Sequence, residues 1–243
     1  MPGTLVTGAA GSIGTHLMKV LPGAVGIDLK DWDIRFPYDS ADPYDPDLVY
    51  HLAASKDAPE GEIDPRDVLL TNAVGTLHIL DRWPQAKVVL ASTCKACDPE
   101  TAYGSTKLVA ERLVLNAGGW VARFHNVTDT AGNVFEKWAS LPADAPIPWT
   151  NCHRYFITAQ NAVDLLLEVT KHPPGRYLFF PGHRRHMLHV AKFHYPDRDL
   201  VQIPRRRGDR ISEPLVALNE QATAVADGPG WLYRVVNTHD PVV

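Results

Sequence analysis

The stretch that decides the fold is TLVTGAAGSIG, residues 4–14. Thr4–Val6 is a short apolar run typical of a buried strand, and Ser12–Leu21 has the apolar spacing of a helix. Glycines between a strand and a helix allow a tight turn, and they let backbone N–H groups approach a phosphate that faces the helix N-terminus. The stretch therefore predicts a dinucleotide-binding loop, with a plain turn as the alternative. The loop residues expected to bind the cofactor are Gly8, Gly11, Ser12, Ile13 and Gly14.

An acidic residue ends the next predicted strand, Ala24–Asp28. Asp28 lies 14 residues beyond Gly14, where a carboxylate can accept a hydrogen bond from the 2′-hydroxyl of an adenosine ribose. That pairing favours NAD as the cofactor. Lys30 would suit a 2′-phosphate, so NADP stays open as the alternative.

Strand and helix patterns alternate along the first half of the chain. The predicted strands are Thr4–Val6, Ala24–Asp28, Leu48–Leu52, Lys87–Ser92 and Trp120–Phe124, and the predicted helices are Ser12–Leu21, Arg66–Trp83 and Thr101–Asn116. This alternation predicts an α/β fold with a doubly wound, Rossmann-type parallel sheet. Lys30–Asp47 is too short for the usual extra helix and strand, so we expect a sheet that is shortened in its first half.

The pattern changes after Phe124. Helices are expected over Asn133–Leu141 and Ala159–Lys171, strands over Tyr155–Thr158 and Arg176–Phe180, and a proline-rich loop over Pro142–Pro148. We expect residues 1–125 to form the NAD-binding core with the catalytic groups. Residues 126–243 would form a small substrate-binding portion, packed on the core so that the two make one globular unit.

Composition limits the possible partners. The 243 residues carry a net charge of −4, so no overall basic field attracts nucleic acid or an anionic membrane. No apolar run is long enough to span a membrane, and no secretory signal is visible. Three cysteines are too few for a disulfide framework. We therefore expect a cytoplasmic protein without nucleic-acid or membrane partners.

The segment YGSTK, residues 103–107, opens a predicted helix beyond the strand Lys87–Ser92. Residues four apart share a helix face, so Tyr103 and Lys107 can face one ligand. A phenol is a poor base at neutral pH, but positive charge from Lys107 and an oxidised nicotinamide stabilises the phenolate. Tyr103 would then take a hydroxyl proton while a hydride leaves the same carbon. In isolation this spacing usually marks a surface helix, whereas after a glycine loop it favours a dehydrogenase-type site.

With these motifs the chain resembles the extended short-chain dehydrogenase/reductases, most closely the branch of UDP-N-acetylglucosamine 4,6-dehydratases and capsular-polysaccharide epimerases. HLAASK at 51–56 is similar to the branch's H-A-A-A-x-K, NAVGT at 72–76 to N-x-x-G-T, and STCKA at 92–96 to S-T-D-K-A. RFHNV at 123–127 is similar to R-F-G-N-V, GNV at 132–134 to G-S-V, and RYFIT at 154–158 to R-F-F-M-T. RRGDR at 206–210, followed by Glu213, resembles R-P-G-E-K-x-x-E. The likeness runs nearly end to end.

The resemblance implies roles for individual residues. Thr93 would bond the sugar hydroxyl, Tyr103 would deprotonate it, and Lys107 would hold the nicotinamide ribose. Lys95 would be the base that removes the proton next to a transient ketone. The further residues implied to bind the cofactor are Asp33, Ile34, Leu52, Ala53, Ala54 and Asn72. Those implied to bind the nucleotide sugar are Lys56, Thr93, Asn126, Asn133, Val134, Arg154, Arg206 and Glu213, of which Asn126, Arg206 and Glu213 would grip its diphosphate. By the same likeness, the helices Arg66–Trp83 and Thr101–Asn116 would pair in a homodimer.

One departure bears on the reaction. Where the family has the aspartic acid that protonates the leaving hydroxyl, this chain has Cys94. A thiol can in principle donate a proton, so Cys94 is a candidate catalytic residue, but it is a weaker acid and hydrogen-bonding partner than a carboxyl group. We therefore expect an NAD-dependent enzyme that oxidises C4 of a nucleotide sugar transiently, with 4,6-dehydratase as the first interpretation and epimerase as the second. A net oxidoreductase acting on a free sugar or sugar acid, and a non-catalytic NAD-binding sensor, stay open.

Other reactive side chains are weaker signals. Cys94 and Cys97 form a C-x-x-C pair, but a zinc site needs two more ligands, and we expect no metal. His125 stands where the family has glycine and is a candidate pocket residue. The clusters Arg184–His186 and Arg205–Arg207 are better explained as a clamp for a diphosphate than as nucleic-acid contacts, because arginine binds phosphate through two hydrogen bonds.

Overall fold

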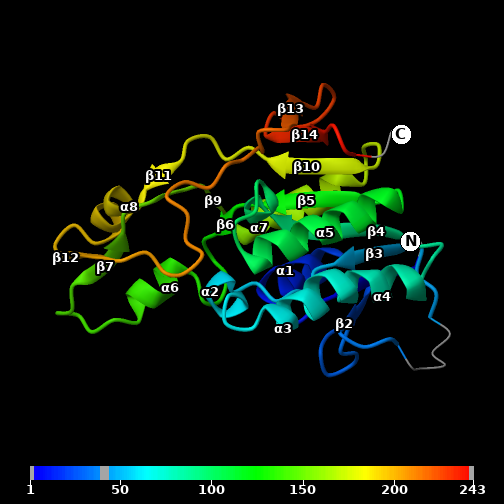
Figure 1. The fold of residues 1–243 in the computed structure, drawn as a ribbon, viewed down its shortest axis with the longest axis horizontal. Coiled ribbons are helices and arrows are strands. Elements are labelled where there is room, and N and C mark those ends of the chain that lie inside the picture. Colours follow the sequence, from blue (N-terminus) through cyan, green and yellow to red (C-terminus); the bar gives the residue numbers. More distant parts are fainter. Residues whose placement is uncertain (1–2, 39–43, 241–243) are drawn as a thin grey trace.

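A central eight-stranded sheet organises the computed structural model, which describes residues 3–38 and 44–240 (Figure 1). Its strands lie in the order β13-β14-β10-β5-β4-β3-β1-β2. Their bounds are β1 Thr4–Thr7, β2 Val25–Ile27, β3 Leu48–His51, β4 Lys87–Thr93, β5 Trp120–Phe124, β10 Gly175–Phe179, β13 Glu220–Ala224 and β14 Leu232–Asn237. The six strands from β2 to β10 pair in parallel, and β14 and β13 continue the sheet antiparallel. The prediction of a Rossmann-type sheet is confirmed.

Helices cover both faces of this sheet. The α-helices of the described residues are α1 Ser12–Val20, α2 Ala58–Gly61, α3 Pro65–Leu69, α4 Gly75–Arg82, α5 Ala102–Asn116, α6 Val134–Ala139, α7 Ala159–Val169 and α8 Met187–His194, of which α6 and α8 pack in the small lobe described below. Leu17 of α1 packs with α7 in the core of one face, and Ile79 of α4 packs with Val114 of α5 in the core of the other. The strands between them are apolar on both sides, as the unbroken run Val88–Leu90 illustrates, because both faces are covered.

The predicted helix Arg66–Trp83 is a composite. A π-helical turn, η1 (Leu70–Val74), separates α3 from α4. Turns of this kind are frequent at functional sites because they redirect side chains within an otherwise regular helix. A 3₁₀ turn, η2 (Cys94–Ala96), follows β4 and carries Lys95.

The shortened first half of the sheet has an aromatic cover. β2 is the last strand on its side of the described sheet, as the short connection after Asp28 predicts. Trp32 lies edge-on to Tyr38 and to Trp83, with ring centroids 4.9 and 5.9 Å away. The Trp83 indole donates to the Tyr44 carbonyl at 3.0 Å. These aromatic residues pack the connection between β2 and β3 against the end of α4. Residues 39–43 of the predicted connection lie outside the described residues.

The second half builds a small lobe at the carboxyl ends of the parallel strands (Figure 1). Three pairs of short strands shape it: β7 (Ile147–Thr150) with β12 (Leu200–Ile203), β8 (His153–Arg154) with β11 (Arg185–His186), and β6 (Asn126–Val127) with β9 (Phe156–Ile157). Its core holds Trp138, Ile147 and Met187. The prediction of a loop over Pro142–Pro148 is wrong at its C-terminal end, because Ile147 and Pro148 belong to β7. Ile147 is buried there and pairs with β12.

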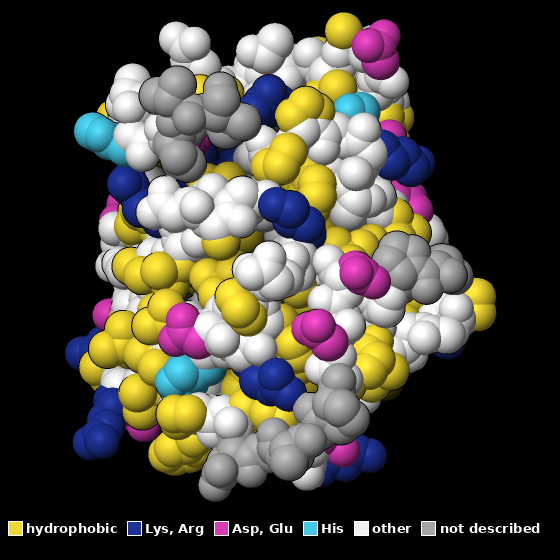
Figure 2. All heavy atoms as spheres, turned by 90° about the vertical axis from the view of Figure 1, so that its right-hand side faces the viewer, with side chains coloured by type: hydrophobic (Ala, Val, Ile, Leu, Met, Phe, Trp, Pro, Cys, Tyr) yellow, Lys and Arg dark blue, Asp and Glu magenta, His cyan; other side chains and the backbone are white. Residues whose placement is uncertain are grey.

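No helix in the described ranges is both long and apolar enough to cross a membrane. Figure 2 shows the end of the molecule that carries the N and C marks in Figure 1, far from the lobe. Apolar and charged side chains of both signs are mixed over this surface (Figure 2).

Candidate active site

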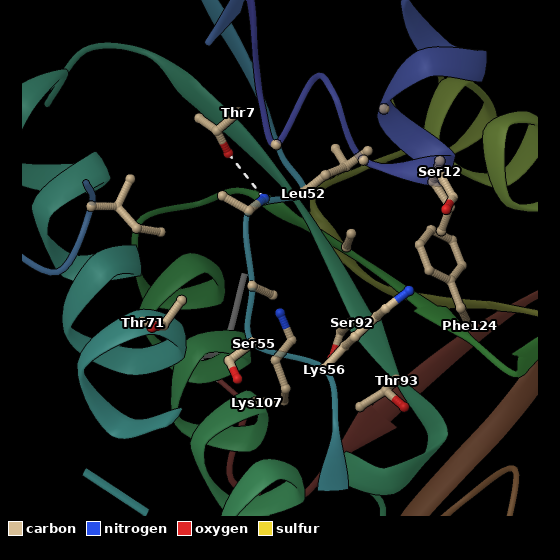
Figure 3. A pocket seen from close by; sticks show the side chains of 18 of the residues that line it. Thr7, Ser12, Leu52, Ser55, Lys56, Thr71, Ser92, Thr93, Lys107 and Phe124 are labelled. Atoms are coloured by element: carbon tan, nitrogen blue, oxygen red, sulfur yellow. Dashed lines mark hydrogen bonds between the residues drawn. The ribbon is translucent and has the colours of Figure 1, made fainter. Parts of the chain in front are cut away.

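Two adjoining cavities lie where the parallel strands end. The first, of about 640 Å³, is lined by the glycine loop, the ends of β2, β3 and β4, and α5 (Figure 3). The second, of about 520 Å³, lies in the lobe. Both are lined by Lys56, Lys95, Asn126, Val127 and Thr130, so the two are continuous.

The glycine loop has the close packing that its sequence predicts. Gly8 has φ +69°, and a Cβ at this position would lie 2.7 Å from the Ala53 nitrogen. A Cβ on Gly14 would overlap the Gly8 carbonyl. Helix α1 begins at Ser12 without a side-chain cap, so its first N–H groups face the cavity mouth uncapped by the protein. The loop can therefore receive a diphosphate.

Acidic residues mark the far end of the first cavity. Asp28 accepts hydrogen bonds from the backbone N–H groups of Ala10 and Leu29, both at 2.8 Å, which fixes its carboxylate beside the loop. Asp33 is held by the Arg35 guanidinium, and hydrogen bonding by Arg35 lowers the pKa of Asp33. Arg35 also bonds Asp67 on α3 at 2.7 Å. The expected adenosine residues Asp28, Asp33 and Ile34 all line this cavity.

A buried histidine ties β1 and β3 together beside the loop. The Thr76 hydroxyl donates to the Asn72 carbonyl at 2.6 Å, so Thr76 Oγ1 accepts from His51 Nε2 at 3.1 Å. His51 Nδ1 therefore accepts from the Thr7 hydroxyl at 2.7 Å, and Thr7 Oγ1 accepts from the Ala53 N–H (Figure 3). Burial lowers the pKa of His51 to about 3, so the ring is neutral. It connects Thr7 of β1 to Thr76 of α4 through hydrogen bonds.

Asn72 is the first correction. The resemblance implied that it binds the cofactor, but its side chain lies behind the loop, 1% exposed, and outside the lining of both cavities. Its Oδ1 accepts from the Ser55 N–H at 2.9 Å, and its Nδ2 donates to the Ser55 carbonyl and to Thr106 Oγ1. All of its hydrogen-bonding capacity is thus used to join the loop after β3 to α5. The contacts of Asn72 thus stabilise the backbone behind the first cavity.

The tyrosine–lysine pair lies inside the first cavity as predicted. Tyr103 and Lys107, one turn apart on α5, line it together with Thr93 from the end of β4. Figure 3 shows Lys107 and Thr93. Burial raises the pKa of Tyr103, while the charge of Lys95 and a hydrogen bond with Thr93 act in the opposite direction. Burial lowers the pKa of Lys107 to about 8, although the Glu111 carboxylate opposes this shift. The side chains can therefore exchange a proton with a ligand hydroxyl at the cavity floor.

A buried ion network that the sequence analysis missed lies beneath these residues. Ser92 donates to Glu111 at 2.6 Å. Glu111 binds Arg123 of β5 at 2.7 Å and Arg176 of β10 at 2.8 Å, and Arg123 also binds Glu220 of β13 at 2.6 Å. Glu111 follows Lys107 by four residues on α5, a spacing that could have indicated it. Glu220 lies too far along the chain for any local pattern to find it.

A second buried cluster surrounds Glu213 where the two cavities meet. Glu213 Oε1 binds Lys95 Nζ at 2.8 Å and Arg154 Nε at 3.4 Å. Its Oε2 accepts from Asn126 Nδ2 at 2.8 Å and from the Cys94 thiol at 3.6 Å. Burial alone would raise the pKa of Glu213, but the charges of Lys95 and Arg154 lower it, so the group is a carboxylate.

Cys94 is the second correction. Implied to be the acid that faces the leaving group, it is 2% exposed and outside the lining of both cavities. Burial, followed by the Glu213 charge, raises the pKa of its thiol to about 12. The thiol therefore bonds to protein and has no direct path to a substrate. Cys97 and Cys152 are also buried and reduced, and no group of three potential ligands within residues 3–38 and 44–240 could hold a metal.

The remaining predicted residues line one or both cavities. Asn133 caps α6 by accepting from Phe135 N at 2.7 Å, and Lys56 donates to the Ala131 carbonyl at 3.1 Å. His125 also lines the first cavity, and its Nε2 donates to the Phe179 carbonyl at 3.0 Å. Burial lowers the pKa of His125 to about 4, so the ring is neutral. Within the described residues Asn72 and Cys94 line neither cavity. Of the two basic clusters expected to clamp a diphosphate, Arg206 lines the second cavity, whereas Arg184–His186, Arg205 and Arg207 line neither.

Comparison with known proteins agrees with this architecture. The model of the polysaccharide biosynthesis protein family matches residues 38–228. The chain belongs to this family. Relatives include the inverting UDP-N-acetylglucosamine 4,6-dehydratase of Campylobacter jejuni serotype O:2, 29% identical over 73% of this chain and 66% of the relative. Another is the UDP-glucose 4-epimerase of Rickettsia felis, 28% identical over 78% of this chain and 61% of the relative.

The fold of this family member also matches a solved structure closely. The structure of Pen from Bacillus thuringiensis superposes with a TM-score of 0.81 at 22% identity, covering 98% of this chain and 90% of that one. The family relatives are longer: the matches span about two thirds of each.

Proposed function

We propose that the chain binds NAD in the first cavity and oxidises C4 of a nucleotide-activated sugar transiently, most simply as a 4,6-dehydratase. The observation that carries this proposal is the position of Tyr103 and Lys107 in the same cavity as the glycine loop. The adjoining cavity supplies cations from Lys56, Arg154 and Arg206, which suit a diphosphate.

The first cavity suits NAD on three counts. The glycine loop leaves room for backbone to approach a diphosphate, α1 presents uncapped N–H groups, and Asp28 offers a fixed carboxylate for a ribose hydroxyl. When bound, NAD accepts a hydride from the sugar and later returns it. The cofactor is therefore recycled in the proposed cycle.

Tyr103 would begin the cycle by taking the C4 hydroxyl proton. A buried phenol needs nearby positive charge to ionise; the charge of Lys95 favours the phenolate, and Lys107 lines the same cavity one helical turn away. Thr93, which lines the same cavity as Tyr103, would orient the same hydroxyl. The resulting C4 ketone acidifies the hydrogen on C5, which Lys95, at the junction of the cavities, is placed to remove.

The position of Cys94 favours one second candidate, a 4-epimerase. A dehydratase needs an acid for the departing C6 hydroxyl, and the buried Cys94 thiol does not face the cavity. A 4-epimerase needs only Tyr103 and the cofactor, because hydride returns to the opposite face of the ketone. The epimerase relatives support this candidate at the level of the family.

The test is to incubate the protein with NAD and a panel of UDP-, dTDP- and GDP-sugars and to analyse the products by mass spectrometry. A product lighter by one water supports the dehydratase, and an isomer supports the epimerase. Accumulation of NADH in step with turnover would indicate a net oxidoreductase. A non-catalytic sensor would bind NAD without changing any sugar, and the substitution Tyr103→Phe would leave its NAD binding unaffected.

We also propose a homodimer in which α3–α4 and α5 pair with a second copy. Leu69, Leu77 and Val109 on these helices are 47, 41 and 47% exposed, which is apolar surface that a partner could cover. Size-exclusion chromatography with light scattering tests it. The three reduced, buried cysteines are consistent with a proposed cytoplasmic location.

A further inference from the structure

Glu213 is the residue whose position fits least with the role that resemblance implies for it. It was expected to grip a diphosphate, yet a carboxylate repels that group. Its side chain is 3% exposed, and both oxygens are occupied by four protein groups from three different segments. The shortest of these contacts is to Lys95, the expected base.

The ion pair determines what Lys95 can do. Burial disfavours the charge of Lys95, but the Glu213 carboxylate outweighs that effect, and the pKa of Lys95 is raised. The thiol of Cys94 and the phenol of Tyr103 also face the ammonium. An ammonium has no lone pair and cannot take a proton from carbon. Lys95 can act as a base only after its own proton has moved, and Glu213 Oε1, 2.8 Å from Nζ, is placed to receive it.

We propose that Glu213 is a positioning residue that controls the protonation of Lys95: it holds the ammonium at the junction of the cavities and takes up its proton when Lys95 acts on the sugar. This inference rests on the proposed function. The groups that face Glu213 besides Lys95 are Arg154 of β8, Asn126 of β6, Cys94 of η2 and His125 after β5.

The proton balance closes without another reagent. An N–H bond of Lys95 breaks as an O–H bond forms on Glu213. The freed lone pair takes the C5 proton, and the electrons of that C–H bond move toward the C4 carbonyl. The restored ammonium of Lys95 then gives one proton to the departing C6 hydroxyl, which leaves as water. The Glu213 proton returns to Nζ, so the sugar loses one water and Cys94 is not needed as an acid.

The first experiment separates the steps of the reaction in Glu213→Gln, whose amide keeps the size of the side chain but takes up no proton. Transient NADH formation should stay within about threefold of the wild-type rate. With a nucleotide sugar bound, exchange of the C5 hydrogen in deuterated water, and loss of water, should fall about 100-fold, because the proton of Lys95 then has no neighbouring carboxylate to move to, even though the sugar-free variant holds more free amine. Glu213→Asp, which restores a carboxylate, should recover part of that loss. Exchange at the wild-type rate in Glu213→Gln, or an equal loss of both steps in both variants, would overturn the proposal.

The second experiment needs no substrate. The rate at which an amine-acylating reagent modifies Lys95, followed by peptide mass spectrometry near pH 8, reports the fraction of free amine. Glu213→Gln should raise that rate about tenfold or more, because a pKa lowered by one unit gives about ten times as much amine. Asp209→Asn is the matched control: Asp209 lies in the same segment and pairs with Arg154 at 3.7 Å, so the rate at Lys95 should not change.

The two experiments fail differently. If no nucleotide sugar reacts with the wild-type protein, the proposed function fails, and the acylation rates still test the pairing of Glu213 with Lys95. If the wild-type protein is active but Lys95 is acylated equally fast in Glu213→Gln, this inference fails and the proposed function stands.

Discussion

The hydroxyl of Ser92, in the lining of the cofactor cavity, donates a 2.6 Å hydrogen bond to Glu111, whose carboxylate is fully buried between two arginines. This contact links the cavity floor to an ion network that reaches β13 through Glu220. The last strands of the chain therefore support residues at the centre of the site.

Removal of the Glu111 charge should destabilise the protein. Glu111→Gln removes a buried carboxylate that pairs with both Arg123 and Arg176, and loss of one partner of a buried ion pair typically costs about 3–5 kcal/mol. Chemical denaturation measures the loss. Glu168→Gln, which removes a partly exposed partner of Lys171, is the control and should cost less than about 1 kcal/mol. A loss of that small size in Glu111→Gln would show that the network contributes little.

The same network predicts the direction of acid unfolding. The two arginines lower the pKa of Glu111 below its usual value, although burial acts against them. A carboxyl group with a lowered folded-state pKa contributes stability that is fully present above its unfolded pKa and is lost as the pH falls toward the folded value. The free energy of unfolding should therefore decrease steadily below about pH 4.5, and less steeply in Glu111→Gln.

Gly8→Ala should abolish NAD binding without unfolding the protein. Its φ of +69° disfavours alanine, and the new Cβ would meet Ala53 N at 2.7 Å, displacing the loop that receives the diphosphate. Quenching of protein fluorescence by NADH measures the affinity. Gly23→Ala is the control for strain alone, since Gly23 has φ +92° but no atom within 4 Å of the place that an alanine methyl group would take. Equal affinities in both variants would contradict the close-approach argument.

The rate of C4 oxidation should fall as the pH rises through about 8. Burial lowers the pKa of Lys107 to about 8, so its ammonium, which supports the Tyr103 phenolate, is lost above that value. Single-turnover NADH formation across the pH range tests this. Lys107→Met should be slower by about 100-fold or more and should lose the descending limb. A descending limb that persists in Lys107→Met would assign it to another group.

Cys94→Ala should keep C4 oxidation and water loss within about threefold of the wild-type rates. The thiol is buried and outside the cavity lining, and the proposed proton path does not use it. Product formation by mass spectrometry gives both rates. A loss of water elimination by about 100-fold, with C4 oxidation retained, would show that the thiol donates a proton to the leaving group.

Local patterns were sufficient for the parts of the site that lie close together in sequence. The glycine loop, Asp28 and the Tyr103–Lys107 pair all lie in the first cavity, because strand and helix spacing fixes their geometry. Asn72 was assigned to the cofactor because a motif names a residue without giving the direction of its side chain, which the π-helical turn at 70–74 sets. The contacts of Glu213 could not be predicted, because 119 residues separate it from Cys94 and only the folded chain brings them together.

The fold was predictable to a similar degree. The parallel strands are apolar runs with a clear signal, whereas β13 is largely exposed and β8, β9 and β11 have two residues each. Such segments form strands because they pair with neighbours that are distant in the chain. Neither the alternation of their apolar residues nor their composition therefore predicts them as strands.

The aromatic cover over the shortened connection leaves β2 as the border of the sheet, and β2 has only three residues. Another polypeptide could form few main-chain hydrogen bonds along so brief a border, which limits unwanted strand addition. The sheet therefore ends in a strand too short to pair extensively with another chain, while the cavities lie at the carboxyl ends of its parallel strands.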